Sequence, residues 1–84
     1  MSTKEWTEAH PDVKVLMSTD NYAMKFMFKM VDASDSKNVA EREMDLRSLP
    51  LEQDELVLDD YLCSIYELLH QKIVMNRKEE KQNA

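Results

Sequence analysis

The sequence predicts a small α+β domain, in which an antiparallel β-meander of about three strands packs against one long C-terminal α-helix, with a possible short N-terminal helix. Two patterns support this prediction. Over residues 22–33 and 39–46, apolar and polar residues alternate with the period of a half-buried strand. After residue 50, apolar residues recur every three or four positions, as on one face of a helix. The 84 residues suffice for a single domain.

The N-terminal residues 1–11 are predicted to form an arm containing one frayed helical turn around TKEWTEA. Pro11 should end this turn, because the residue before a proline disfavours α geometry. Trp6 is the only tryptophan and is expected to anchor the arm to the rest of the protein. We expect residues 12–80 to form the domain and residues 81–84 to form a frayed polar tail.

Three segments have the composition of strands. They are VKVLMS (13–18), YAMKFMFKMVDA (22–33) and VAEREMDL (39–46), and the acids of the last one suit an edge strand. TDN (19–21) and SDSKN (34–38) supply the polar residues of turns. The chain has no glycine, so any positive φ angle is expected at Asn or Asp.

The C-terminal helix is predicted from about residue 51 to residue 80, with Pro50 in its first turn. Acids gather at its start and bases at its end, which complements the helix dipole. An alternative interpretation makes ELVL (55–58) a fourth short strand and begins the helix at Asp59. A helix of this length would be about 45 Å long, against about 33 Å for a ten-residue strand, so it should extend beyond the sheet.

Two apolar rows are expected to pack against each other, because a one-sided sheet and a one-sided helix each need a partner. The helix row is Leu58, Leu62, Ile65, Tyr66, Leu69 and Ile73, and the strand row is Met24, Phe26, Phe28 and Met30. The alternative for the strand row is an exposed, methionine-lined binding groove.

A second apolar stripe lies on the side of the predicted helix almost opposite the helix row. A helix that buries only one face does not need apolar residues on that side. With the neighbouring acids it forms the predicted partner-binding surface: Leu56, Asp59, Asp60, Cys63, Glu67, His70 and Val74. The simpler alternative is that its apolar members are scattered surface residues, which are normal in soluble proteins.

Signals for catalysis, metals and cofactors are weak. Cys63 and His70 are two helical turns apart, too far for a thiolate–imidazole pair. Glu67 and His70 have the i, i+3 spacing of a di-iron ligand pair, but that site needs a second such pair. His10 has no evident partner. Without glycine the chain lacks GxGxxG and Walker A loops. We therefore expect no enzyme activity, no metal and no cofactor.

The net charge of −6 argues against direct binding to nucleic acid and to anionic membranes. The N-terminus has no apolar core of a signal peptide, and no apolar run reaches the length of a membrane span. Cys63 is the only cysteine, which excludes an intramolecular disulfide and suggests a reducing compartment. These features predict a cytoplasmic protein.

The possible element order α-β-β-β-α is similar, in outline only, to that of the double-stranded-RNA-binding domain. That family needs basic residues at the start of its final helix to contact phosphates. This chain has Asp54, Glu55, Asp59 and Asp60 there, so the sequence does not indicate membership.

The function predicted from these observations is that of a small acidic, non-catalytic protein-binding or regulatory module, of inhibitor or adaptor type. It would act through its acidic surface and the outer face of the C-terminal helix. One alternative is a structural homo-oligomer, a homodimer in the simplest case, formed by pairing of the long helices. Another is an acidic DNA mimic that inhibits a nucleic-acid-binding protein, using the acids Glu41, Glu43, Asp45, Glu52, Asp54, Glu55, Asp59 and Asp60.

Overall fold

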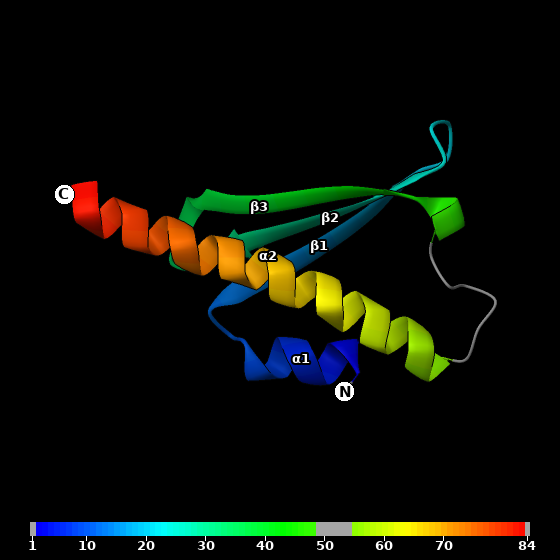
Figure 1. The fold of residues 1–84 in the computed structure, drawn as a ribbon, viewed down its shortest axis with the longest axis horizontal. Coiled ribbons are helices and arrows are strands. Elements are labelled where there is room, and N and C mark those ends of the chain that lie inside the picture. The colour runs from blue at the N-terminus through cyan, green and yellow to red at the C-terminus, as the bar shows by residue number, and fades with distance from the viewer. Residues whose placement is uncertain (1, 49–54, 84) are drawn as a thin grey trace.

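The computed structural model describes residues 2–48 and 55–83, and in the second range it describes the side chains of residues 57–79. A three-stranded sheet packs against a long helix, and a short helix lies beside them (Figure 1), so the predicted α+β fold is confirmed. The elements are α1 (Thr3–Ala9), β1 (Val13–Asp20), β2 (Lys25–Asp32), β3 (Asp35–Asp45), the 3₁₀ turn η1 (Leu46–Ser48) and α2 (Glu55–Asn83).

The sheet has the order β1-β2-β3, and both pairs of strands are antiparallel. The register places Phe28 on the central strand between Met17 and Arg42, so these three side chains share one face of the sheet. The long helix α2 crosses that face obliquely (Figure 1). No element in the described ranges covers the opposite face.

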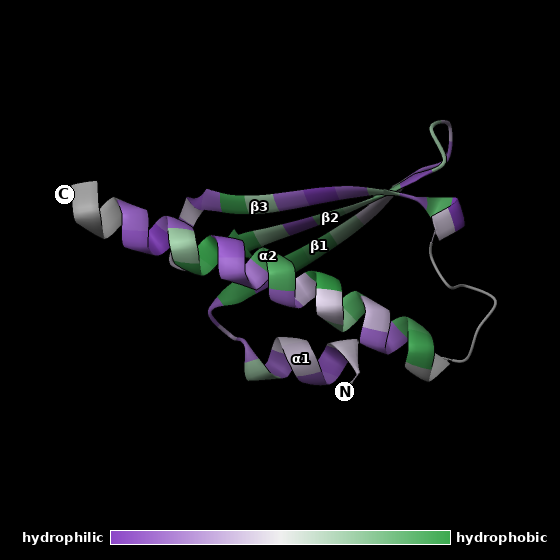
Figure 2. Cartoon of the chain, viewed as in Figure 1, coloured by the Kyte–Doolittle hydropathy of each residue, from purple (hydrophilic) through white to green (hydrophobic). Residues whose placement is uncertain are grey.

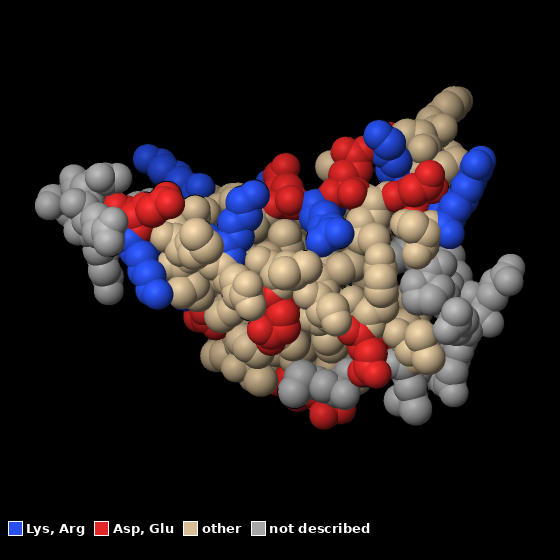
Figure 3. Space-filling model, viewed as in Figure 1, with Lys and Arg blue, Asp and Glu red and all other residues tan. Residues whose placement is uncertain are grey.

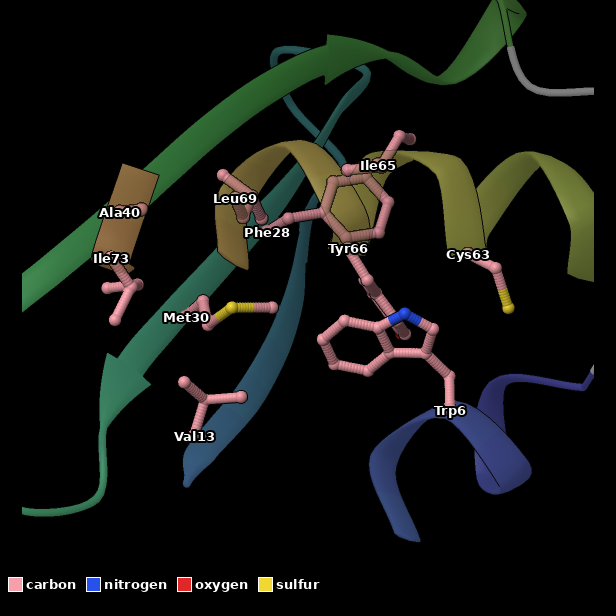
Figure 4. Close-up of a cluster of buried hydrophobic side chains, with 10 residues drawn as sticks. All are labelled: Trp6, Val13, Phe28, Met30, Ala40, Cys63, Ile65, Tyr66, Leu69 and Ile73. Atoms are coloured by element: carbon pink, nitrogen blue, oxygen red, sulfur yellow. The ribbon is translucent and has the colours of Figure 1, made fainter. Parts of the chain in front are cut away.

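The hydrophobic core lies between the sheet and α2, and α1 closes it along one side through Trp6 (Figure 4). The exposed fraction of Trp6 is only 1%, which confirms that this residue anchors the N-terminal arm. The predicted packing of the strand row on the helix row is also found. The buried apolar residues are Trp6, Val13, Phe28, Met30, Ala40, Cys63, Ile65, Tyr66, Leu69 and Ile73.

Met24 departs from the prediction in two ways. Its side chain is 44% exposed and lies in the turn after β1, outside the core row. Its φ angle is +53°, so among the described residues a methionine, not an Asn or Asp, adopts positive φ. The preceding turn explains this: Asp20 Oδ1 accepts hydrogen bonds from the backbone N–H groups of Tyr22 and Ala23, which leaves Met24 to complete the reversal of the chain.

The turn between β2 and β3 is shorter than predicted. Only Ala33 and Ser34 form it, and residues 35–38 belong to β3. The register shifts between Val31 and Asp32, so residues 36–38 bulge out of the regular pairing. The bulge directs Asn38 into the interior, where its side chain is buried.

Residues 55–58 are helical, so the alternative in which ELVL forms a fourth strand is wrong. The predicted helix start at Pro50 lies outside the described residues. The 29 residues of α2 correspond to about 43 Å of helix at 1.5 Å per residue. Its C-terminal end extends beyond the sheet, as predicted (Figure 1), and the coloured turns that lead up to this end are mainly hydrophilic (Figure 2).

Candidate functional site

The predicted partner-binding stripe of α2 faces α1. Cys63 is only 9% exposed, and it points from α2 toward the side occupied by Trp6 (Figure 4). Glu67 accepts a 2.7 Å hydrogen bond on Oε1 from Trp6 Nε1. The expectation that Cys63 lies on an exposed outer face is therefore wrong. The reason is that α1 supplies, from the same chain, the apolar cover that we expected from a partner.

The other residues of that stripe are distributed differently. His70 lies on the same side as α1, and its Nε2 is 3.0 Å from Asp12 Oδ2. Val74 and Asp59 are half-buried, and Asp60 is exposed. The side chain of Leu56 lies outside the described residues. The structure thus brings Glu67 and His70 together around α1, and it does not gather all seven residues into one exposed surface.

An aromatic cluster joins α1 to α2. The rings of His10 and Trp6 stack with a centroid distance of 3.8 Å, and His10 Nδ1 is 2.8 Å from Trp6 O. The ring of His70 meets His10 edge-on at 4.9 Å. His10 Nε2 is 3.9 Å from Glu67 Oε1. These contacts give His10 the partners that the sequence did not reveal.

A polar network continues from this cluster toward the C-terminal part of α2. Arg77 donates from Nε to Asp32 Oδ2 at 2.7 Å and from Nη1 to Asp12 Oδ2 at 3.1 Å. The hydrogen bond from Arg77 is the main cause that holds the pKa of Asp32 well below its usual range. For Asp12, the hydrogen bond with His70 is the main cause of a lowered pKa.

Asn38 completes the network on the sheet side. Its Nδ2 donates to Asp32 Oδ2 at 3.2 Å and to Ile73 O at 3.1 Å, and its Oδ1 accepts from Asn76 at 2.8 Å. Every named polar atom of the network therefore has a partner within the chain. The residues bound together come from the α1–β1 link, the β2–β3 hairpin and α2, so the network fixes the three to one another.

The same contacts limit what this cluster can do in catalysis or metal binding. An Asp–His pair orients a general base in many enzymes, and Asp12 and His70 have that geometry. Here Arg77 also binds Asp12, which makes the carboxylate part of a charge-neutralising group. Within residues 2–48 and 55–83, no three His, Cys, Asp or Glu side chains are arranged so that they could hold a metal ion.

A different site lies on the uncovered face of the sheet. It is a hollow of about 370 Å³ that crosses all three strands, and we call it the sheet hollow. Its exposed apolar walls are Leu16, which is 56% exposed, and Met27, which is 41% exposed. The lining residues whose side chains belong to this face are Leu16, Ser18, Met27, Lys29 and Glu41, and the lining is completed by Met17 and Phe28, whose side chains belong to the face that α2 crosses.

The rim of the sheet hollow carries both positively and negatively charged side chains. Lys29 lies opposite Leu16 on one side and Glu41 on the other, and Lys29 Nζ is 3.9 Å from Glu41 Oε1. Farther along the same face, Lys25 Nζ and Glu43 Oε1 form a 2.7 Å ion pair. Both side chains of the Lys29–Glu41 pair stay about half-exposed.

Sequence reasoning missed this site, although the sequence contained a signal. In the predicted strand 22–33, Met27 lies on the polar parity, between Lys25 and Lys29. The antiparallel register now shows that Leu16 and Met27 are diagonal neighbours on one face, because Leu16 pairs with Lys29 and Ser18 pairs with Met27. The partly buried Val31 and Val39 lie opposite each other on the same face.

The outer side of α2 carries a second, thinner apolar stripe. Val57, Leu68 and Met75 are each exposed, and their spacings of 11 and 7 residues keep them on one helical side. Side chains other than Lys, Arg, Asp and Glu make up most of the surface over the middle of α2 (Figure 3). The residues of this stripe stand apart along the helix.

Comparison with protein-family models, with curated proteins and with solved structures found no match. None of the helices in the described ranges combines the length and the apolar character that crossing a membrane requires.

Proposed function

We propose that this protein is a small, non-catalytic binding module that docks another protein on the sheet hollow. The observation that supports this is the exposure of Leu16 and Met27 around a hollow on the sheet face that both helices leave open. Exposed apolar groups that cluster on a small monomer commonly mark an interaction site. The predicted module is retained, but its binding surface moves from α2 to the sheet.

The chemistry of the hollow defines the partner. A volume of about 370 Å³ suits one or two large apolar side chains. Lys29 and Glu41 on the rim can each pair with an opposite charge that flanks such an anchor. We therefore infer a partner segment with a protruding Leu, Met or aromatic residue between polar neighbours, since anchors of this kind dominate interface energies.

The charge pattern of the open sheet face supports this module over a DNA mimic. Of the acids of the predicted mimic, Glu52, Asp54 and the side chain of Glu55 lie outside the described residues. The open face carries Lys14, Lys25 and Lys29 together with Asp20, Glu41, Glu43 and Asp45, which gives a net charge of −1. The two acids of β3 that lie nearest the hollow are paired with lysines. A phosphate track needs uncompensated acids, so binding here should depend mainly on apolar contact and weaken only modestly with added salt.

Photo-crosslinking in a native lysate tests the proposal. A photoreactive amino acid placed at Lys29, in the hollow, should capture one defined protein, whereas the same group at Ser64, exposed on α2, should not. Covalent homodimers are recognised by mass and counted separately. Adding Met27→Glu should abolish capture from position 29, because it places a charge in the apolar contact.

The matched control is Leu68→Glu, an equally polar change at an exposed residue on α2, which should leave capture from position 29 intact. Both variants should stay folded, as surface substitutions usually change stability by about 0.5 kcal/mol or less. Equal capture from positions 29 and 64, or capture that survives Met27→Glu, would refute docking at the sheet hollow.

A further inference from the structure

We propose that two copies of this protein pair through the outer edge of β1 and form one continuous six-stranded antiparallel sheet. β1 is an edge strand, because the sheet order places only β2 beside it. Among the described residues, its only backbone hydrogen bond outside the β1–β2 pairing joins Val13 N to His10 O. The rest of this edge offers N–H and C=O groups that a further strand can bind.

The residues of β1 lack the features that usually protect an edge strand. Between Lys14 and Asp20 the strand reads VLMST and carries no charge. Leu16 and Met17 are each more than half-exposed. The other edge strand, β3, is bulged near its start and carries Glu41, Arg42 and Glu43, which are features that discourage pairing. β1 is therefore the open edge of this sheet.

The charges of β1 specify its partner as a second copy. Lys14 and Asp20 are each three residues from Met17. When two β1 strands pair antiparallel about a two-fold axis at Met17, Lys14 of each copy lies opposite Asp20 of the other. The same register places Val15 opposite Thr19 and Leu16 opposite Ser18.

Other symmetric registers lose this match. A two-fold axis normal to the sheet keeps each side chain on its own face, so opposing residues must have the same parity. Centring the pair on Leu16 brings Asp20 opposite Asp12, and centring it on Ser18 brings Lys14 opposite Tyr22. Only the register about Met17 forms two Lys14–Asp20 ion pairs, which makes the edge self-complementary.

The Asp20 half of this edge is open to a further strand. In Figure 1, β1 diverges from both α1 and α2 toward its Asp20 end, where Leu16 to Thr19 are exposed. The pairing also places Leu16 and Ser18, which line the sheet hollow, at the seam between the copies. The two hollows would then adjoin across the two-fold axis. The pairing itself does not depend on the function proposed for the hollow.

Sedimentation of the wild-type protein at micromolar concentration should show a dimer. Lys14→Glu should raise the dissociation constant by about tenfold or more, because each of two ion pairs becomes a repulsion. Lys14 is exposed, so the folded monomer should persist. The control Lys4→Glu makes the same charge change on α1 and should leave the dimer intact.

Disulfide trapping tests the register directly. Residues directly opposite in an antiparallel pair have Cα atoms about 4.5–5.5 Å apart, within the range of a disulfide. Met17→Cys should therefore form a covalent dimer under mild oxidation, whereas Thr19→Cys should not, because position 19 lies opposite Val15. The wild-type chain, whose Cys63 is buried, provides the background.

A wild-type protein that stays monomeric at micromolar concentration would overturn the proposal. So would a dimer that crosslinks no faster at position 17 than at position 19, because such a dimer uses another surface, for example paired α2 helices. Photo-crosslinking to a different protein tests the hollow independently, so the failure of one proposal is distinguishable from the failure of the other.

Discussion

At the scale of single residues, Asp32 is a buried carboxylate that four donors bind. They are Ser34 N, Ser34 Oγ, Asn38 Nδ2 and Arg77 Nε, at distances from 2.7 to 3.2 Å. The charged form is favoured by all four, so the pKa is held below its value in the unfolded chain. Through the bond to Arg77, Asp32 at the end of β2 connects the sheet to α2.

The lowered pKa of Asp32 predicts acid sensitivity. A carboxylate whose folded pKa is depressed contributes stability above its unfolded pKa of about 3.9, and this contribution is lost as the pH falls toward the folded pKa. Urea unfolding should therefore show a falling free energy of unfolding below about pH 4. Asp32→Asn should cost about 3 kcal/mol at neutral pH and flatten that acid slope, since Arg77 loses a buried partner.

The control is Glu8→Gln on the exposed side of α1, which should keep both the stability and the slope of the wild type. If Asp32→Asn preserved the wild-type acid slope, another carboxylate would be responsible.

Met24 provides a second prediction at this scale. A side chain at positive φ clashes with the backbone, at a cost of roughly 1–2 kcal/mol that glycine avoids. Glycine also makes the unfolded chain more flexible, so Met24→Gly should give a net stabilisation of about 0.5–1 kcal/mol. Met24→Val should destabilise the protein, because a branched β-carbon aggravates the clash. Thermal unfolding measures the stability of both variants, and midpoints equal to that of the wild type would contradict backbone strain at Met24.

At the scale of elements, α1 acts as a cover for one side of α2. Its N-terminus is capped by Ser2, whose Oγ accepts from Glu5 N, and this fixes the short helix so that Trp6 points inward. Trp6 meets Tyr66 at 5.4 Å between ring centroids and hydrogen-bonds Glu67. Seven residues would not form a stable helix alone, so α1 depends on this packing.

Trp6→Ala should therefore loosen α1 and expose Cys63. We expect a loss of about 3–5 kcal/mol in the free energy of unfolding and a faster reaction of Cys63 with a thiol reagent under native conditions. Burial raises the pKa of the wild-type thiol, which slows its reaction. Leu68→Ala, on the exposed side of α2, should change neither quantity. Unchanged labelling of Trp6→Ala would show that α1 does not protect Cys63.

At the scale of the whole molecule, the protein is a flat slab of 47 × 30 × 15 Å. Its radius of gyration is 14.0 Å, whereas a compact chain of this length would have about 12 Å. One helix layer on one sheet layer encloses a single thin core, and no element within residues 2–48 and 55–83 covers the other face of the sheet. Small domains of this kind bury little surface and are only marginally stable.

Dimerisation through β1 would add to this small stability. The thermal midpoint of the wild type should then rise with protein concentration, because dimerisation stabilises the native state by mass action. The midpoint of the Lys14→Glu variant should be lower at each concentration and should depend less on concentration over the same range. Calorimetry over a series of concentrations measures both, and a constant wild-type midpoint would argue against a stabilising dimer.

The sequence alone predicted the approximate place of the helices and strands and the main apolar row that each turns toward the core. Alternation over Phe26, Phe28 and Met30 and the three-and-four spacing from Ile65 to Ile73 are local patterns, and each sets one apolar face. Because such faces must be buried against each other, the α+β class followed. The acidic, non-catalytic binding module remains a prediction, and so do its cytoplasmic location and its lack of a cofactor.

Only the tertiary structure decided what covers each surface. Cys63 looks exposed on a helical projection, but it is buried on the side of α2 where Trp6, some sixty residues earlier in the chain, packs. Leu16 and Met27 look like isolated surface residues until the register makes them neighbours. Periodicity assigns a face to each residue from its near neighbours, whereas the partner of that face is set by contacts between distant segments, which no local pattern encodes.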